Sequence, residues 1–426
     1  MKKIGFWILT SLVMGNMVGS GIYLLPSSLA AIGSITLGSW IMTSIGSIFL
    51  ALVFASLSQR FPKTGGPYVY CREGLGHFIG FQVAYSYWIY MGVGIAAISV
   101  AFTGYLSAFF PVLAASRELA FASTVSILWL ITLINLVGVH FAGTFQLIIT
   151  ILKFIPLFLV TGVALFHFDS SFLDAVNVSG KSDYRALSEG AMLTLWAFLG
   201  LESACVPADE VENPKKTIPR ATIIGVCLAS LIYLLSTLAI MGALPNEVLK
   251  TATYPFALLA EKFMGPVGKW ILATGAMMSC VGALNGWLLV QTQIGLAASK
   301  DGLFPRSFSR LSAKRAPVVG LLASASLITL LLTMTIKQSL ISQFTSIITI
   351  ATLAAIFAYL YTSISEVILQ KRGARKEILI ALLAFVYVFW AITSTPQTLL
   401  YFATLLLFLS LPVYAWMKRY EQKKNL

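Results

Sequence analysis

The stretch Gly15–Pro26, with the sequence GNMVGSGIYLLP, interrupts an apolar run that extends from about residue 5 to about residue 30. Glycine lowers the stability of a helix and proline removes a backbone donor, so this stretch predicts a helix that unwinds near its middle. Unwound backbone at membrane depth is tolerated only where it lines a cavity or is buried in protein. Taken alone, Gly15 and Gly19 could also reflect close packing of two helices, which uses the same spacing.

A second apolar run carries the same kind of interruption. Gly200-Leu201-Glu202-Ser203 lies in its middle and is followed by Pro207. In both runs a proline follows the aligned glycine, Gly19 or Gly200, by seven residues. Paired interruptions at corresponding positions are typical of transporters built from inverted repeats, with the substrate site between the two breaks. The second interruption therefore favours broken helices over simple close packing.

The composition decides between a soluble and a membrane protein. Of the 426 residues, 58% are hydrophobic and 11% are charged, and the mean hydropathy is +0.87. A soluble domain has about a quarter charged residues, so an ordinary soluble enzyme and a disordered chain are both excluded. A spanning helix needs about 20 apolar residues, and an open strand edge cannot be satisfied in lipid. Each long apolar run is therefore expected to be a helix.

The apolar runs predict an all-α polytopic membrane protein with about 12 transmembrane helices. They lie at about 5–30, 37–58, 80–110, 119–139, 144–166, 187–206, 221–243, 266–297, 317–336, 342–369, 377–395 and 398–417. Because a five-helix repeat has an odd number of spans, its second copy has the opposite orientation. We expect a 5+5 inverted repeat with broken helices 1 and 6, made of residues 1–166 and 186–370. An external loop at 167–185 joins the copies, and residues 371–426 supply helices 11 and 12 and a cytoplasmic tail.

The basic residues predict the orientation. With a cytoplasmic N-terminus, 21 of the 29 Lys and Arg residues fall on the cytoplasmic side, seven fall outside, and Lys153 lies within a span. The positive-inside rule then places both termini in the cytoplasm. We expect a multi-pass protein of the plasma membrane, which in a bacterium is the inner membrane.

Several other classes lack support in the sequence. No basic run is long enough for a nucleic-acid surface, and the four Cys and three His residues are scattered, so neither a metal site nor a cofactor is expected. A membrane-embedded enzyme would need a metal cluster, a Ser/His pairing or a phosphate loop, and a channel would need a filter loop or a ring of like charges. No such pattern is visible, which favours a transporter of a small molecule.

The chain resembles the amino acid–polyamine–organocation superfamily, and within it the basic amino acid/polyamine antiporters, such as arginine/agmatine and putrescine/ornithine exchangers. The resemblance covers nearly the whole chain and is carried by GNMVGSGIYLLP at 15–26, TGGPYVYCREGLG at 64–76, LTLWAFLGLESAC at 193–205, VENP at 211–214, Gly286-Trp287 and DGLFP at 301–305. It implies a secondary active transporter of amino acids, with amino acid or amino acid/polyamine antiport as the expected mode and proton-coupled symport as the alternative. The partners are then a small-molecule substrate and the lipid bilayer, and the oligomeric state stays open, with a homodimer as one alternative.

The resemblance also implies a substrate site at the two breaks. The substrate carboxylate is expected at the free amides of Ser20 and Gly21, because a helix N-terminus is a sound anion site. The substrate amino group is expected at the backbone carbonyls of Met17, Trp196 and Leu199.

Aromatic residues are expected to enclose this site. The resemblance makes Trp196 and Trp287 walls or gates and places Tyr87 near the outer gate. An aromatic face attracts an ammonium or guanidinium group by about 0.5–2 kcal/mol. The alternative for either tryptophan is a packing or interface-belt role.

Four residues depart from the pattern of arginine-selective exchangers. Ile95 stands where those exchangers have Asn, Ala351 stands where they have Ser, and Tyr90 and Met91 replace smaller residues. A buried guanidinium without acceptors costs several kcal/mol, so the side-chain pocket is expected to disfavour arginine and agmatine. Neutral amino acids of moderate size are expected to bind better.

Three ionisable residues lie within predicted spans, where a charge is costly and is a functional candidate by default. Glu202 is expected to pair with a cationic substrate or to act as a proton-linked gate, the alternative being a carboxylate that only satisfies loose amides. Lys153 resembles the lysine that, in other superfamily members, takes the place of a sodium ion and contacts the first break, which disfavours sodium coupling. A snorkelling lysine is the alternative. Glu366 is expected to be a surface carboxylate paired with the basic run that begins at Lys371.

Overall fold

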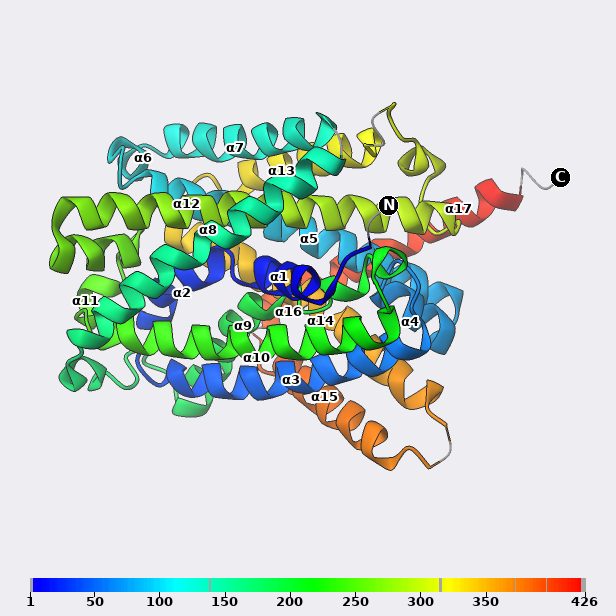
Figure 1. Cartoon of the computed structure of the whole chain (residues 1–426), viewed down its shortest axis with the longest axis horizontal. Coiled ribbons are helices and arrows are strands. Elements are labelled where there is room, and N and C mark those ends of the chain that lie inside the picture. The colour runs from blue at the N-terminus through cyan, green and yellow to red at the C-terminus, as the bar shows by residue number, and fades with distance from the viewer. Residues whose placement is uncertain (1–2, 138, 314–315, 372, 396, 423–426) are drawn as a thin grey trace.

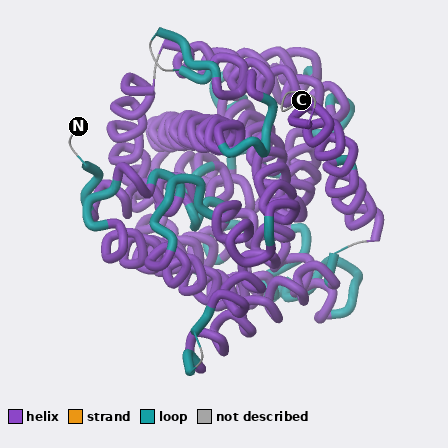
Figure 2. Tube along the Cα trace, turned by 90° about the vertical axis from the view of Figure 1, so that its right-hand side faces the viewer, coloured by secondary structure: helices purple, strands orange, loops and turns teal. Residues whose placement is uncertain are grey.

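The computed structural model describes residues 3–137, 139–313, 316–371, 373–395 and 397–422. The described chain is helical and has no strand; Figure 2 shows helices joined by loops, and one isolated β-bridge joins Ile4 to Val211. Together with the length and apolar character of these helices, this confirms the predicted all-α polytopic membrane class.

Many of the longer helices run side by side along the long axis of the molecule (Figure 1). Their bounds are α1 Phe6–Met17, α2 Ser20–Ala30, α3 Thr36–Arg60, α4 Pro67–Leu75, α5 His77–Leu106, α6 Val112–Ala115, α7 Arg117–Val137, α8 Val139–Phe166, α9 Asp183–Phe198, α10 Pro214–Met241, α11 Asn246–Leu249, α12 Pro255–Lys300, α13 Val318–Thr335, α14 Leu340–Leu369, α15 Arg375–Thr393, α16 Gln397–Phe408 and α17 Ser410–Gln422. Short 3-10 turns lie at Ser170–Leu173 (η1), Ser203–Cys205 (η2), Ala208–Glu210 (η3) and Arg306–Ser309 (η4).

Among the described residues, nine helical stretches are long and apolar enough to cross a membrane, with α1 and α2 counted together as Phe6–Ala30. Part of α8, Leu152–Phe166, is a shorter apolar helix. The remaining expected spans are divided: α9 ends at the second interruption, and the last expected span consists of α16 and α17. The count of 12 crossings stays a prediction.

Both predicted helix breaks are present. The first helix stops at Met17 and resumes at Ser20, and the backbone between them leaves the helical region, with ψ of 78° at Val18 and −130° at Gly19. The second helix stops at Phe198, continues in an extended conformation at Leu199, and turns at Gly200 with φ of +98°. Only glycine adopts that φ without strain, so Gly200 explains why the chain unwinds here.

Helices at equal positions in the two expected halves pack against each other: α3 against α10, α5 against α12, and α7 against α13. In addition, α5 packs against α14, and α12 packs against α8, which is the corresponding pair in the other half. These are the contacts that a five-helix inverted repeat would produce. The equivalence of residues 1–166 and 186–370, and the boundaries at 167–185 and 371–426, stay predictions.

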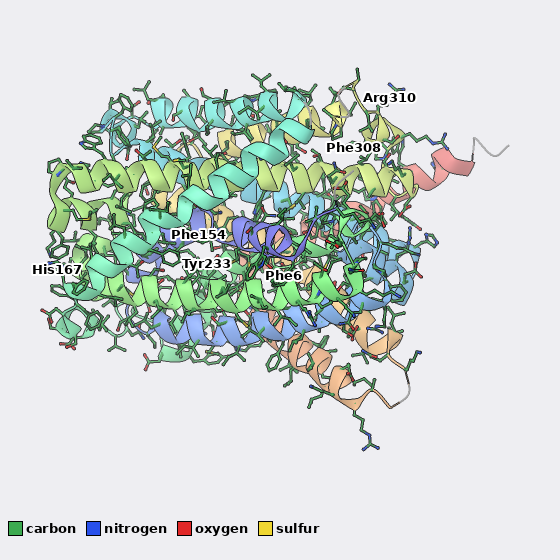
Figure 3. The ribbon with its side chains drawn as sticks, viewed as in Figure 1. Phe6, Phe154, His167, Tyr233, Phe308 and Arg310 are labelled. Atoms are coloured by element: carbon green, nitrogen blue, oxygen red, sulfur yellow. The ribbon has the colours of Figure 1, made fainter. Side chains whose placement is uncertain are left out.

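The helices form a bundle with two ends. Figure 3 places His167 at one end, here called the outer end, and Arg310 at the opposite end, here called the inner end. The last helix, α17, extends toward the inner end in Figure 1. At the inner end Arg72 Nη1 lies 2.6 Å from Asp301 Oδ2, and the Tyr68 hydroxyl donates to the same oxygen over 3.1 Å. Burial, and then the nearby Asp301 charge, raise the pKa of Tyr68.

The expectation for Glu366 is wrong. Its side chain is 1% exposed and pairs with Arg60 of α3, while Gln370 donates to its other oxygen. The basic run at Lys371 is close to Glu366 in the sequence, whereas the packing of α14 against α3 brings Arg60, 306 residues away, to the carboxylate. A buried carboxylate needs a partner of this kind.

Cysteine labelling tests which end faces the cytoplasm. Lys337 and Lys371 are exposed and flank α14, whose 30 residues span about 45 Å. With the four native cysteines replaced, Lys337→Cys is expected to react with an impermeant thiol reagent in intact cells, and Lys371→Cys only after permeabilisation. The opposite pattern would invert the predicted orientation. Lys314 and Lys424, which the charge argument also places inside, lie outside the described residues.

Candidate functional site

Glu202 lies in the second break with its carboxylate fully buried. Three tyrosine hydroxyls donate to it: Tyr87 and Tyr90 of α5 to Oε1, both over 2.5 Å, and Tyr359 of α14 to Oε2 over 2.7 Å. No Lys or Arg among the described residues forms an ion pair with it. The centre of the bundle therefore contains a carboxylate that is hydrogen-bonded but has no positive partner from the described chain.

Two tryptophan rings lie next to this carboxylate. The Trp196 and Trp287 centroids are 5.2 Å apart, and the Tyr90 ring meets Trp287 edge to face at 6.0 Å. Gly94 of α5 allows this approach, because a Cβ there would overlap the Trp287 ring and lie 2.9 Å from Trp196 Cη2. Likewise a Cβ on Gly21 would lie 3.3 Å from Trp196 Cδ1. The first amides of α2 and the two tryptophans thus surround one region.

Both breaks leave polar backbone groups at the ends of their helices. Ser20 and Gly21 begin α2, so their N–H groups have no acceptor within the helix, and the buried Ser20 hydroxyl has no hydrogen-bond partner. The Met17 carbonyl accepts the Gly19 N–H, and the Trp196 carbonyl accepts the Leu199 N–H. A carbonyl oxygen has a second lone pair, so each can accept one more donor. The structure thus places all five predicted backbone positions at the ends of the two broken helices.

Asn16 links the two breaks. Its side-chain amide donates to the Ser203 hydroxyl over 2.8 Å, and its backbone carbonyl accepts the Trp287 indole N–H over 3.0 Å. The Tyr233 hydroxyl donates to the Ala197 carbonyl over 2.8 Å, directly before the second break, and Figure 3 shows Tyr233 midway along the bundle. The conformation of the two breaks is therefore fixed by side chains from α1, α10 and α12.

Lys153 of α8 reaches the first break. Its ammonium donates to the carbonyls of Gly15 and Val18, each over 2.6 Å, and the side chain is 1% exposed. The Ser279 hydroxyl also donates to the Val18 carbonyl, over 3.3 Å. Lys153 does not snorkel to the protein surface, and its contact with the break is the one that the resemblance implied. The role of that contact in coupling stays a prediction.

The four residues expected to select the substrate side chain are all buried. Tyr90 contacts Glu202, as described above, and Met91 and Ile95 follow it on α5 with exposures of 0% and 1%. Ala351 is buried on α14, eight residues before Tyr359, which places both on roughly the same side of that helix. Their contact with a substrate stays a prediction.

Several residues of this region were not predicted from the sequence. Tyr359, Asn16, Ser203 and Gly94 all contact or adjoin predicted site residues. Polar residues within apolar runs were the available signal for the first three. For Gly94 the signal was weaker, since glycine is frequent in membrane helices.

The central residues are closed off from solvent at both ends: Glu202, Tyr87, Trp196 and Trp287 have exposures between 0% and 3%. A substrate therefore reaches them only after helices move. Within the part of the chain that the structure describes, no three His, Cys, Asp or Glu side chains gather where they could bind a metal ion.

Comparison with known proteins gives the family. A sequence profile of the amino acid permease family matches residues 4–418. The chain is 33% identical to the putrescine transporter PotE of Haemophilus influenzae, with 99% of each chain covered, and 34% identical to PotE of Escherichia coli, with 100% of this chain and 98% of the relative covered. It is also 35% identical to the cadaverine/lysine antiporter of Escherichia coli, over 78% of this chain and 74% of that one. From the profile and these full-length relatives, the chain belongs to the amino acid permease family of membrane transporters.

Proposed function

We propose that this protein is a secondary active antiporter that exchanges an amino acid for a polyamine. The observation that carries the proposal is the buried Glu202 carboxylate, which accepts three tyrosine hydroxyls and has no ion-pair partner among the described Lys and Arg residues. A buried charge is costly unless it is compensated, and an ammonium group of the substrate would compensate it. The names of the similar transporters, putrescine in one and cadaverine and lysine in the other, support a substrate of this chemistry.

The two charges of an amino acid have separate places in this proposal. The α-carboxylate binds the free amides of Ser20 and Gly21, where the positive end of the α2 dipole favours an anion. The amino groups bind near Glu202 and at the carbonyls of Met17, Trp196 and Leu199, with the Trp196 and Trp287 rings as walls. A polyamine lacks the carboxylate, so it would rely on Glu202 and the aromatic rings.

Vesicle exchange tests the proposal. Purified protein in liposomes loaded with lysine or putrescine is expected to take up labelled putrescine or lysine, whereas empty liposomes are expected to take up little. Liposomes without protein are the control for leakage. The proposal would be abandoned if loaded and empty vesicles took up no amine or amino acid above that control.

Competition tests the substrate side chain. Met91, Ile95 and Ala351 offer no side-chain acceptor, so a guanidinium would lose hydrogen bonds that an alkyl chain does not need. Against a labelled substrate, putrescine, lysine and neutral amino acids of moderate size are expected to compete better than arginine and agmatine, by about tenfold or more. Micromolar inhibition by arginine would mean that these residues have been matched to the wrong positions.

A further inference from the structure

A cavity of about 320 Å³ lies at the outer end between α2, α9 and α14. Ser27, Ser28, Ser342, Thr345 and Ser346 line it with hydroxyl groups, and its charged lining residues are Lys181, Glu189 and Lys250. A volume of this size is in the range of small-molecule sites, which are about 300–1,000 Å³.

The cavity and the central site are lined by residues of the same helices, α2 and α9. On α9, Glu189 and Leu193 line the cavity, and Trp196 follows at helical spacing on the same face. On α2, Ser28 lies seven residues beyond Gly21, which corresponds to about 10 Å along the helix. The Ser28 and Thr345 hydroxyls, which both line the cavity, share a hydrogen bond of 2.8 Å that joins α2 to α14.

The cavity contains one carboxylate and one ammonium as a pair. Lys181 Nζ lies 2.5 Å from Glu189 Oε2, and their side chains are 47% and 36% exposed. An exposed ion pair of this kind contributes little to the free energy of folding. The charged groups of a ligand can therefore replace either partner at a small energetic cost. Lys250 is paired separately with Glu247, which does not line the cavity. The loop that carries Lys181 is held in place by Asn177, whose amide donates to the Lys181 carbonyl over 2.9 Å.

We propose that this cavity is an outer entry site for α-amino acids, in which Glu189 binds the ammonium and Lys181 binds the carboxylate. The proposal rests on the proposed function and extends it to the first step of uptake. A free amino acid carries both charges and replaces both partners of the Lys181–Glu189 pair, while the surrounding hydroxyls bind its remaining donors and acceptors. A diamine would satisfy Glu189 and be repelled by Lys181. The outer site therefore favours amino acid over diamine at the outer face.

Substitutions at the pair are expected to have opposite effects on the two substrates. Glu189→Gln is expected to raise the external half-saturation concentration of both lysine and putrescine by about two- to fivefold. Lys181→Met is expected to raise the half-saturation concentration of lysine by a similar factor and to lower the half-saturation concentration of putrescine. Maximal exchange rates should change less than about twofold, because neither residue belongs to the central site.

A second ion pair at the outer end gives matched controls. Lys269 Nζ lies 3.2 Å from Glu261 Oε2 on α12, and neither residue lines the cavity. Glu261→Gln and Lys269→Met make the same charge changes and are expected to leave both half-saturation concentrations unchanged. If the cavity variants behave like these controls, or if Lys181→Met shifts lysine and putrescine in the same direction, the outer site is refuted.

A measurement without transport separates this inference from the proposed function. Ser346 lines the cavity and is half-buried, so Ser346→Cys, with the native cysteines replaced, is expected to react with an impermeant thiol reagent. Added lysine should slow this reaction, and should not do so when Glu189→Gln is also present. Protection without vesicle exchange would keep the outer site and reject the proposed function, whereas exchange without protection would do the reverse.

Discussion

Replacing Glu202 by glutamine is expected to reduce exchange by about 10- to 150-fold, the equivalent of one lost hydrogen bond to a charged group at about 1.5–3 kcal/mol. Glutamine keeps the size of the side chain but cannot compensate an ammonium. With the amide nitrogen in place of Oε2, the Tyr359 hydroxyl would have to accept a hydrogen bond where it now donates one, while Tyr87 and Tyr90 could still donate to Oε1.

Two other variants separate the charge of Glu202 from its hydrogen bonds. Tyr87→Phe removes one hydroxyl and leaves the carboxylate, so its effect is expected to be smaller than that of Glu202→Gln. Glu261→Gln removes a carboxylate at the outer end and serves as a control for net charge. If Glu202→Gln reaches the membrane in normal amount and exchanges substrate at the normal rate, Glu202 only satisfies loose polar groups of the break.

The two helix breaks of the candidate site could be predicted from the sequence because each break has a local cause. Glycine at Gly19 and Gly200 weakens the helix at those positions whatever surrounds them, and the structure interrupts both helices there. Pro26, in contrast, lies inside α2 and does not end it. The break is thus caused by the glycines and the backbone around them.

The side-chain contacts of the site could be predicted only in part, because they depend on which helices meet. Tyr87 and Glu202 were predicted to share the site, yet the third hydroxyl comes from Tyr359, 157 residues beyond Glu202. The pairing of Glu366 with Arg60 was missed for the same reason, since it requires α14 to pack on α3. Hydropathy marks a helix as buried but does not say which polar residue of another helix lies opposite.

The ends of helices and the short helices could not be predicted from the hydropathy pattern either. Gly265 has a non-helical conformation, with φ of +70° and ψ of −168°, so α12 consists of two helices that meet there. The second begins near residue 266, where the span was expected, whereas the first, at 255–264, was not expected. The last expected span is divided between α16 and α17. These features follow from connections at the membrane surface, where apolar runs give little information.

Removing the Lys153 ammonium is expected to impair exchange strongly, because it holds the first break. Lys153→Met keeps most of the volume of the side chain but leaves the Gly15 and Val18 carbonyls without their 2.6 Å donor. The Val18 carbonyl keeps the Ser279 hydroxyl at 3.3 Å, whereas the Gly15 carbonyl loses the donor from Lys153. A buried acceptor left unsatisfied costs about 1–3 kcal/mol, so exchange is expected to fall by about tenfold. Lys153→Ala, which also leaves a cavity, should be at least as severe. The melting temperature and membrane content of both variants will show how much of the loss reflects folding.

Two mechanisms give the same result for these variants and differ in what drives net uptake. In the first, Lys153 stays charged and replaces a sodium ion at the break, so that transport is exchange and depends on substrate on the opposite side. In the second, a buried lysine that loses and regains its proton during the cycle would couple uptake to a proton gradient. An inward proton gradient across empty vesicles is therefore the deciding measurement, and we expect it to drive little uptake, while vesicles loaded with amino acid take up labelled substrate. Neither mechanism uses sodium, because the ammonium already occupies the carbonyls of the break. Stimulation of the native protein by sodium would contradict both and would assign Lys153 a purely structural role.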